Sequence, residues 1–338
     1  MTTILVLNLG SPKDLNKNNV KEYLREFLSD DLVVDLPKPI QQFILRCFIL
    51  PFRPKVTKEA YEKIWTEQGS PLLIYTESIA RKLSKSMNMP TIVAMRYQQP
   101  SIEKAIKKLK ENREEEVIVL PLYPHHAQAT TTTTILEVKR QIAKHYPSLS
   151  AIYVEPFSNE ESYIDALAKN IQSQIKEDFD MLLFSYHGIP ERQLKKTEIN
   201  KKHCMVVDDC CHQPCEASYQ CYKSNLTIAT EKVVEKLQLP EDKWEITFQS
   251  RIGPGWLKPF TDKTLVKLGK SNKKRILVAS PAFIADCLET LEEINIRGRE
   301  SFISAGGRQF TQLNCLNDSK ESINCLSKVI NKAITGNS

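Results

Sequence analysis

The chain has 338 residues, of which 41% are hydrophobic and 26% are charged, which is the composition of an ordinary globular protein. Its 47 Lys and Arg residues are interspersed with 41 Asp and Glu residues, so the formal net charge of +6 is too diffuse to indicate a nucleic-acid-binding protein. No stretch approaches the roughly 18 apolar residues of a membrane-spanning helix.

The N-terminal residues lack the features of a secretory signal peptide, because the apolar run from Ile4 to Leu7 is short and ends at Asn8. We therefore expect a cytoplasmic protein whose thiols stay reduced. In that compartment, its nine cysteines are expected to be free thiols or metal ligands rather than disulfides.

Short apolar runs alternate with segments of helical periodicity along the chain. The expected strands lie at residues 4–10, 91–94, 117–120, 151–154, 181–184, 246–248 and 276–279. The expected helices lie at residues 102–109, 163–175, 226–237, 288–296 and 322–334. This alternation predicts βαβ units and parallel sheets that are covered by helices on both faces.

The alternating pattern occurs twice, which predicts an α/β protein with two similar halves. We expect an N-terminal half at residues 1–156 and a C-terminal half at residues 157–312, which contains the cysteine-rich segment. Residues 313–338 are expected to form a C-terminal helix that packs back on the body. In such folds, ligands bind beyond the carboxyl ends of the strands.

A histidine follows the strand expected at residues 181–184, in the string Ser-Tyr-His-Gly-Ile-Pro-Glu-Arg at residues 185–192. A histidine at the carboxyl end of a strand can titrate near neutral pH and can bind a metal, so His187 is a candidate base or ligand. The alternative is a capping histidine in an ordinary loop.

Three carboxylates recur in the helical segment near residue 290. At about 100° per residue, Asp286, Glu289 and Glu293 would fall within roughly a 60° arc of one helix face. Such a row can guide a hard divalent cation or relay protons. The alternative is the solvated stripe of an amphipathic helix.

A turn-rich segment follows the strand expected at residues 246–248. Its Trp256 can pack against a flat ligand and its Arg251 can bind an anion, unless the first lies in the core and the second at the surface. Upstream, His125 and His126 precede five threonines that resemble the start of a helix.

Five of the nine cysteines lie within eighteen residues, in the pattern C-x5-C-C-x3-C-x5-C. They are Cys204, Cys210, Cys211, Cys215 and Cys221. Four thiolates would suit a [2Fe–2S] cluster or tetrahedral zinc, and the alternative is a set of unligated thiols. We expect Cys210 or Cys211 to be surplus, because adjacent cysteines seldom both bind one cluster.

Several strings, in this order and spacing across nearly the whole chain, resemble those of the ferrochelatases. They lie at residues 7–12, 27–30, 64–72, 95–97, 120–124, 185–192, 248–251, 286–293 and 315–317. The resemblance implies two Rossmann-like chelatase domains with a porphyrin cleft between them and a C-terminal helix that returns to the first domain.

The resemblance also implies roles for individual residues. His187 and Glu289 would be catalytic, would contact the substrate iron and would face each other across the porphyrin, with Asp286 and Glu293 as a supporting acidic row. The residues implied to bind porphyrin are Arg96, Tyr97, Tyr123, Ser185 and Trp256. In this chain, Arg297 stands where an acidic residue often continues the row, which shortens any relay at Glu293.

The implied activity is the insertion of Fe2+ into protoporphyrin IX, which gives protohaem and two protons as the last step of haem synthesis. The alternatives are a chelatase for coproporphyrin or another tetrapyrrole, and a non-catalytic haem or iron–sulfur sensor on the same fold. The internal cysteines resemble those of members that carry a [2Fe–2S] cluster, with zinc as the less favoured cofactor.

Membrane attachment and assembly are separate questions. Residues 40–52 correspond in the family to a lip that can touch the inner face of the membrane peripherally. No nucleic-acid partner is expected, and the sequence leaves the oligomeric state open.

Overall fold

The computed structural model describes residues 2–197, 202–213, 215–251 and 253–336. The chain divides into two compact units. Unit 1 contains Met1–Tyr123, Ala127–Pro156 and Leu326–Ser338, and unit 2 contains Pro124–His126 and Phe157–Cys325.

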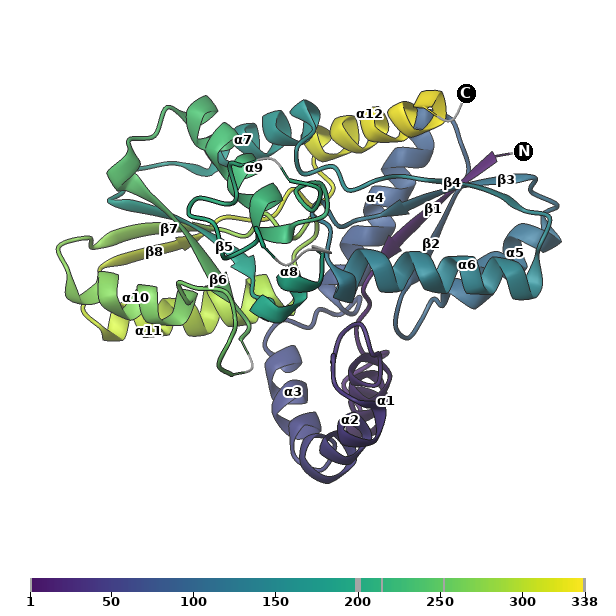
Figure 1. The fold of residues 1–338 in the computed structure, drawn as a ribbon, viewed down its shortest axis with the longest axis horizontal. Coiled ribbons are helices and arrows are strands. Elements are labelled where there is room, and N and C mark those ends of the chain that lie inside the picture. Colours follow the sequence, from purple (N-terminus) through teal and green to yellow (C-terminus); the bar gives the residue numbers. More distant parts are fainter. Residues whose placement is uncertain (1, 198–201, 214, 252, 337–338) are drawn as a thin grey trace. The chain divides into compact units, whose positions relative to one another are not determined.

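Unit 1 is built on a parallel four-stranded sheet in the order β2-β1-β3-β4 (Figure 1). Its strands are β1 (Thr2–Asn8), β2 (Thr91–Met95), β3 (Glu116–Pro121) and β4 (Ser150–Tyr153). Helices α5 and α6 pack against the face that carries Leu5 and Leu7, and α4 packs against β1 and β2. Strand β1 is therefore buried from Thr3 to Asn8, as parallel sheets covered on both faces require.

The helical segments of unit 1 include two π-helices, which are labelled η. In chain order they are α1 (Lys17–Leu28), α2 (Lys38–Ile44), η1 (Leu45–Ile49), α3 (Arg53–Glu62), α4 (Pro71–Met87), α5 (Ile102–Glu111), η2 (Gln128–Thr132) and α6 (Thr133–His145). Helix α12 (Lys320–Gly336) belongs to unit 1 from Leu326 onward.

Unit 2 repeats the same plan with a parallel sheet in the order β6-β5-β7-β8. Its strands are β5 (Met181–His187), β6 (Trp244–Gln249), β7 (Arg275–Ala279) and β8 (Gln309–Gln312). Its helical segments are α7 (Glu161–Gln174), α8 (Glu191–Thr197), α9 (Tyr222–Leu237), the 3-10 helix η3 (Glu241–Lys243), α10 (Thr261–Lys270), the π-helix η4 (Glu289–Gly298) and α11 (Arg299–Ser304).

Both faces of the second sheet are covered as well. Leu183 belongs to a core cluster with residues of α10, η4 and α11. Tyr186 lies on the opposite face by strand alternation, and its hydroxyl is 2.7 Å from the Thr230 hydroxyl of α9. Two parallel sheets flanked by helices confirm the predicted fold class.

Two local features differ from the sequence prediction. Strand β8 was not predicted, because Phe310 is its one buried apolar residue and its place is set by pairing with β7. The segment predicted as an α-helix at residues 288–296 is mainly the π-helix η4, which begins at Glu289. No helix among the described residues is long and apolar enough to cross a membrane.

Candidate active site

His187 is the last residue of β5 and pairs in register with Gln249, the last residue of β6. Strand alternation turns its side chain to the same face as Leu183, where η4 packs. The side chain is half-buried. The sheet therefore presents His187 at its carboxyl edge, where ligands bind in folds of this kind.

A backbone carbonyl holds the His187 ring. Nδ1 lies 2.7 Å from the carbonyl oxygen of Gly188, and the ring of Phe283 lies edge-on at 6.5 Å between centroids. A carbonyl can only accept, so this contact selects the form with a proton on Nδ1. In the neutral ring, Nε2 then keeps a lone pair that can accept a proton or bind a metal.

The buried side chain of Gln249 joins the strand of His187 to the helix of Glu289. Its Nε2 donates to the Glu289 carbonyl oxygen at 3.1 Å, and its Oε1 accepts from the Ser185 hydroxyl at 2.6 Å. His187 and Glu289 are therefore tied to one edge of the same sheet, and both side chains are half-buried.

Asp286 does not share a helix face with Glu289 and Glu293, which corrects the sequence-based expectation. It precedes the helix and is only 2% exposed. Its carboxylate accepts from Thr290 at 2.7 Å, from the Asn317 amide at 2.7 Å and from the Cys315 backbone N–H at 3.3 Å. These bonds make Asp286 an anchor for the segments around it, with little freedom to relay protons.

Glu293 is held at the site by the residue after Gln249. Both the backbone N–H and the hydroxyl of Ser250 donate to its carboxylate. Ser250 has a left-handed backbone with φ of 64°, which is uncommon outside glycine and marks a constrained position. Arg297, which stands where the family often has a further acidic residue, pairs with the buried Glu292 at 2.8 Å.

In unit 1, Arg96 and Tyr97 follow β2 and converge on Asp30. One Asp30 oxygen accepts from the Arg96 guanidinium, from the Tyr97 hydroxyl at 2.9 Å and from the Thr133 hydroxyl. Burial opposes ionisation of Asp30. The hydrogen bonds from Thr133 and the Leu32 backbone, with the charge of Arg96, outweigh it and lower the pKa of the carboxyl below its ordinary value.

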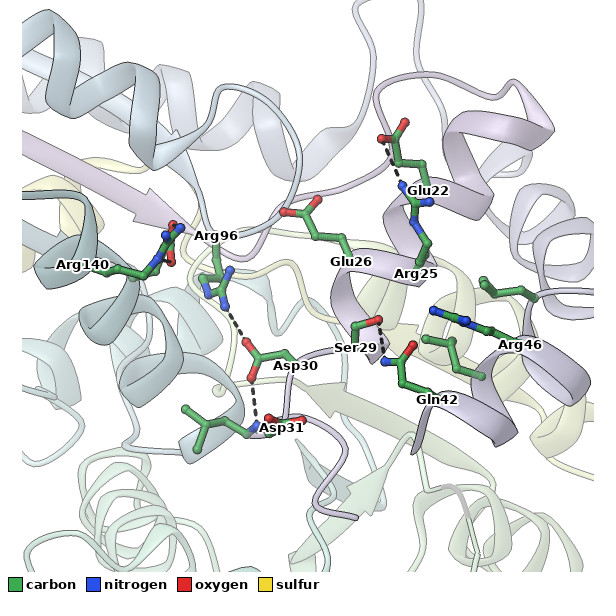
Figure 2. A pocket seen from close by; sticks show the side chains of 14 residues that line it. Glu22, Arg25, Glu26, Ser29, Asp30, Asp31, Gln42, Arg46, Arg96 and Arg140 are labelled. Carbon is green, nitrogen blue, oxygen red and sulfur yellow. Dashed lines mark hydrogen bonds and ion pairs between the residues drawn. The ribbon is translucent and has the colours of Figure 1, made fainter. Parts of the chain in front are cut away.

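Arg96 and Asp30 also line a charged pocket of about 860 Å³ in unit 1 (Figure 2). The wall carries three further guanidinium groups, of Arg25, Arg46 and Arg140. Arg140 makes two bonds of 2.8 Å to Glu137, and Arg25 lies 3.7 Å from Glu22. The same wall carries five carboxylates, of Glu22, Glu26, Asp30, Asp31 and Glu137, so the lining is mixed in charge and its cations are balanced by acidic groups.

The other residues implied to bind porphyrin are placed differently from one another. Tyr97 is fully buried and packs in a core cluster with Val20 and Leu24, so it supports Arg96 from behind. Tyr123 and Ser185 are also buried. Trp256 is half-buried, and its strand-like bridge to Pro190 places it beside the turn that follows His187.

The cysteine segment, residues 204–221, gathers several thiols. Cys204 interacts with Cys221, and Cys210 interacts with Cys211, whereas the Cys215 thiol accepts from the Ser218 hydroxyl at 3.5 Å. Burial, and then the neighbouring Cys210, raise the pKa of Cys211 to about 11 against the opposing charge of Lys223.

A cation would relieve this crowding of thiols by favouring their deprotonated form. Among the described residues, however, no three His, Cys, Asp or Glu side chains are already arranged to hold a metal ion. The segment therefore supplies suitable donors without a preformed coordination geometry.

Comparison with known proteins decides the family. A family model described as Ferrochelatase matches residues 1–334. The chain belongs to the ferrochelatase family. It is 39% identical to a ferrochelatase of Opitutus terrae, over 96% of this chain and 95% of that one, and 37% identical to one of Pseudomonas putida, over 98% of both chains. The resemblance inferred from the sequence is confirmed.

Solved structures of other proteins share the fold of this chain. SirB from Bacillus subtilis, solved with Fe3+, matches 99% of this chain and 96% of its own with a TM-score of 0.58 and 11% identity. A sirohydrochlorin chelatase SirB in complex with cobalt matches with a TM-score of 0.53. At such low identity the likeness concerns the fold alone, so this ferrochelatase's site must be argued from its own residues.

Sequence reasoning did not select three residues that organise the site. Asp30, Gln249 and Ser250 all lie in strings that resemble the family, but their side chains suggest no chemistry by themselves. The available signal was their position, since Gln249 and Ser250 come where a parallel strand ends.

Asp30→Asn should lower the free energy of unfolding by about 2 kcal/mol near pH 7, because a charged acceptor of three hydrogen bonds is lost. The lowered pKa means that this stability is present above the ordinary carboxyl pKa of about 3.9 and is lost as the pH falls through the folded-state value. Urea unfolding of both proteins across an acidic pH series measures the difference.

The control for this prediction is Asp31→Asn, because Asp31 is 65% exposed in its pair with Lys38 and should change stability by at most about 1 kcal/mol. A loss in Asp30→Asn that does not shrink toward acid pH would contradict a role for the Asp30 charge.

Proposed function

We propose that this ferrochelatase inserts Fe2+ into protoporphyrin IX, giving protohaem and two protons in the terminal step of haem biosynthesis. The observation that carries the proposal is His187 at the carboxyl edge of the second sheet. Its Nδ1 is occupied by the Gly188 carbonyl, which leaves Nε2 as the acceptor.

The proposed reaction requires bases that accept protons from the porphyrin. Free-base porphyrin carries two pyrrole N–H protons, and Fe2+ replaces both, so the products are the metallated ring and two protons. His187 accepts the first proton through Nε2 and contacts the metal. Glu289 is its acidic partner, and Glu293, oriented by Ser250, leads protons away from the site.

Recognition of the porphyrin would use both aromatic and cationic groups. The half-buried Trp256 beside the His187 turn offers a flat apolar surface for the macrocycle. Arg96, supported by Tyr97 and Asp30, offers a guanidinium to the carboxylates of the substrate. Tyr123 and Ser185 would act from behind, because their side chains are buried.

His187→Ala should reduce anaerobic haem formation from protoporphyrin IX and Fe2+ by about 10²- to 10⁴-fold, the range for loss of a positioned base. Porphyrin binding, followed by fluorescence quenching, should persist. His145→Ala is the matched control. His145 is the last residue of α6, lies near Glu103 of α5 and is outside the proposed site. Undiminished turnover in His187→Ala would reject the assignment of the base.

We further propose that four of the five thiols of the cysteine segment hold a [2Fe–2S] cluster. The support is the number of thiols, the interaction of Cys204 with Cys221 and of Cys210 with Cys211, and the burial of Cys204 and Cys221. When bound, the cluster would tie the segment together and respond to oxidants. It would transfer no electrons to the substrate, because metal insertion involves no change of oxidation state.

Protein purified without oxygen should contain equal amounts of iron and acid-labile sulfide and show visible thiolate-to-iron absorbance. Single Cys→Ser variants of the segment should abolish this colour in four cases and spare it in one, because a cluster of this type takes four protein ligands. Cys47→Ser is the control, since Cys47 is exposed and outside the segment. Colourless protein with bound zinc and no sulfide would contradict the proposal.

The lip, residues 40–52, is proposed to contact a membrane peripherally. Phe43, Phe48 and Phe52 are 60%, 60% and 69% exposed, and the rings of Phe43 and Phe48 pack edge-on at 5.8 Å. Arg46 and Arg53 lie in the same region and are exposed. An exposed apolar group flanked by cations is typical of a surface that inserts into anionic lipid.

Replacing Phe43 and Phe48 together by serine should weaken binding to phosphatidylcholine–phosphatidylglycerol vesicles by more than about tenfold, since each buried ring contributes about 1.5–3 kcal/mol. Cosedimentation measures the change. Ile303→Ser is the control, because Ile303 is 42% exposed on α11 of unit 2 and lies outside residues 40–52. Equal vesicle binding by all three proteins would exclude the lip as the contact.

A further inference from the structure

The peptide group that joins His187 to Gly188 is held from both sides. Its carbonyl oxygen accepts a hydrogen bond from the Tyr222 hydroxyl at 2.9 Å. Its N–H donates to the Gln249 carbonyl at 2.8 Å. These two bonds set the plane of the peptide and therefore the backbone angles on either side of it.

The orientation of this peptide affects the His187 ring directly. The next carbonyl, of Gly188, is the one that lies 2.7 Å from Nδ1. Glycine has a permissive backbone, and the close approach of Gln249 leaves no room for a side chain here, since a Cβ would lie 2.9 Å from its carbonyl oxygen. The hydrogen bonds at the peptide, rather than the residue itself, must therefore keep the Gly188 carbonyl in place.

Tyr222 has a fixed position of its own. It is the first residue of α9 and 5% exposed, and its ring contacts the buried His125 ring edge-on at 6.0 Å. Because the ring has no room to swing, the place of its hydroxyl depends on where α9 begins.

The cysteine segment determines that beginning. Cys221 is the N-cap residue of α9 and directly precedes Tyr222. Ser224 donates to the Cys211 carbonyl at 2.8 Å, and Asn225 donates to the Cys221 carbonyl at 2.9 Å. A rearrangement of the segment would thus displace the first turn of α9 and the Tyr222 hydroxyl with it.

We propose that Tyr222 is a positioning residue through which the cysteine segment controls the orientation of His187. This inference rests on the proposed role of His187 as the base. It assigns the segment a function in the reaction that needs no electron transfer. A displacement of the segment would loosen one of the two hydrogen bonds on the His187–Gly188 peptide and release the ring.

Tyr222→Phe removes the hydroxyl and keeps the ring. Its kcat for haem formation should fall about tenfold, the upper end of what one neutral hydrogen bond contributes, with the porphyrin KM unchanged. The matched control is Tyr186→Phe. Tyr186, like Tyr222, packs against the His125 ring, but its buried hydroxyl bonds to Thr230 and not to the His187–Gly188 peptide. The control should keep its kcat within about twofold.

A second readout separates positioning from general stability. In protein with 15N-labelled histidine, the His187 signal, identified by its absence in His187→Ala, should report a proton on Nδ1 in the wild type and in Tyr186→Phe. In Tyr222→Phe it should shift toward a mixture of the two tautomers. An unchanged His187 signal, or equal losses of kcat in the two tyrosine variants, would overturn the proposal.

The link to the cysteine segment is tested by a double-mutant cycle. Cys221→Ser should lower kcat in the wild type and have little further effect in Tyr222→Phe, because the route is already broken. Fully additive losses would overturn the link. If His187→Ala keeps its activity, the proposed function fails. If His187→Ala is inactive while Tyr222→Phe behaves like Tyr186→Phe, the positioning role alone fails.

Discussion

The parallel pairing of β5 with β6 is the constraint on which the candidate active site depends. It sets His187 opposite Gln249 and lets the buried Gln249 side chain bind both Ser185 and the start of η4. A buried amide without partners would cost free energy, so these bonds hold the strand ends and the helix in one arrangement. The sheet thereby sets the positions of both His187 and Glu289.

The π-helix η4 carries Glu289 and Glu293, the two carboxylates proposed to take part in the reaction. Hydrogen bonds from residue i to i+5 widen the helix, and such segments are frequent at functional sites. Asp286 lies just before the helix. Its carboxylate accepts hydrogen bonds from Thr290 and Asn317, and these bonds fix the start of the helix. Glu289 and Glu293 are left half-buried at the sheet edge, where a carboxylate can serve chemistry rather than structure.

In unit 1, hydrogen bonds to a carboxylate likewise fix a charged side chain. Asp30 gathers three donors on one oxygen and so fixes Arg96, a side chain that would otherwise lose much conformational freedom on binding a ligand. Pre-organising the guanidinium in this way favours recognition of an anion. The relatives and the solved chelatases share the fold, but these pairings belong to this chain's own side chains.

The sequence by itself determined the alternation of strands and helices, the family, and the placement of His187 at the carboxyl end of a strand. These properties depend on local periodicity and on strings of neighbouring residues, which survive without knowledge of contacts. Only the tertiary structure decided that Gln249 joins the strand of His187 to the helix of Glu289, that Asp286 is an anchor and that Tyr222 reaches the His187 peptide. Those roles arise from hydrogen bonds between residues that are 31 to 40 positions apart in the sequence. Such partners are set by packing rather than by local pattern.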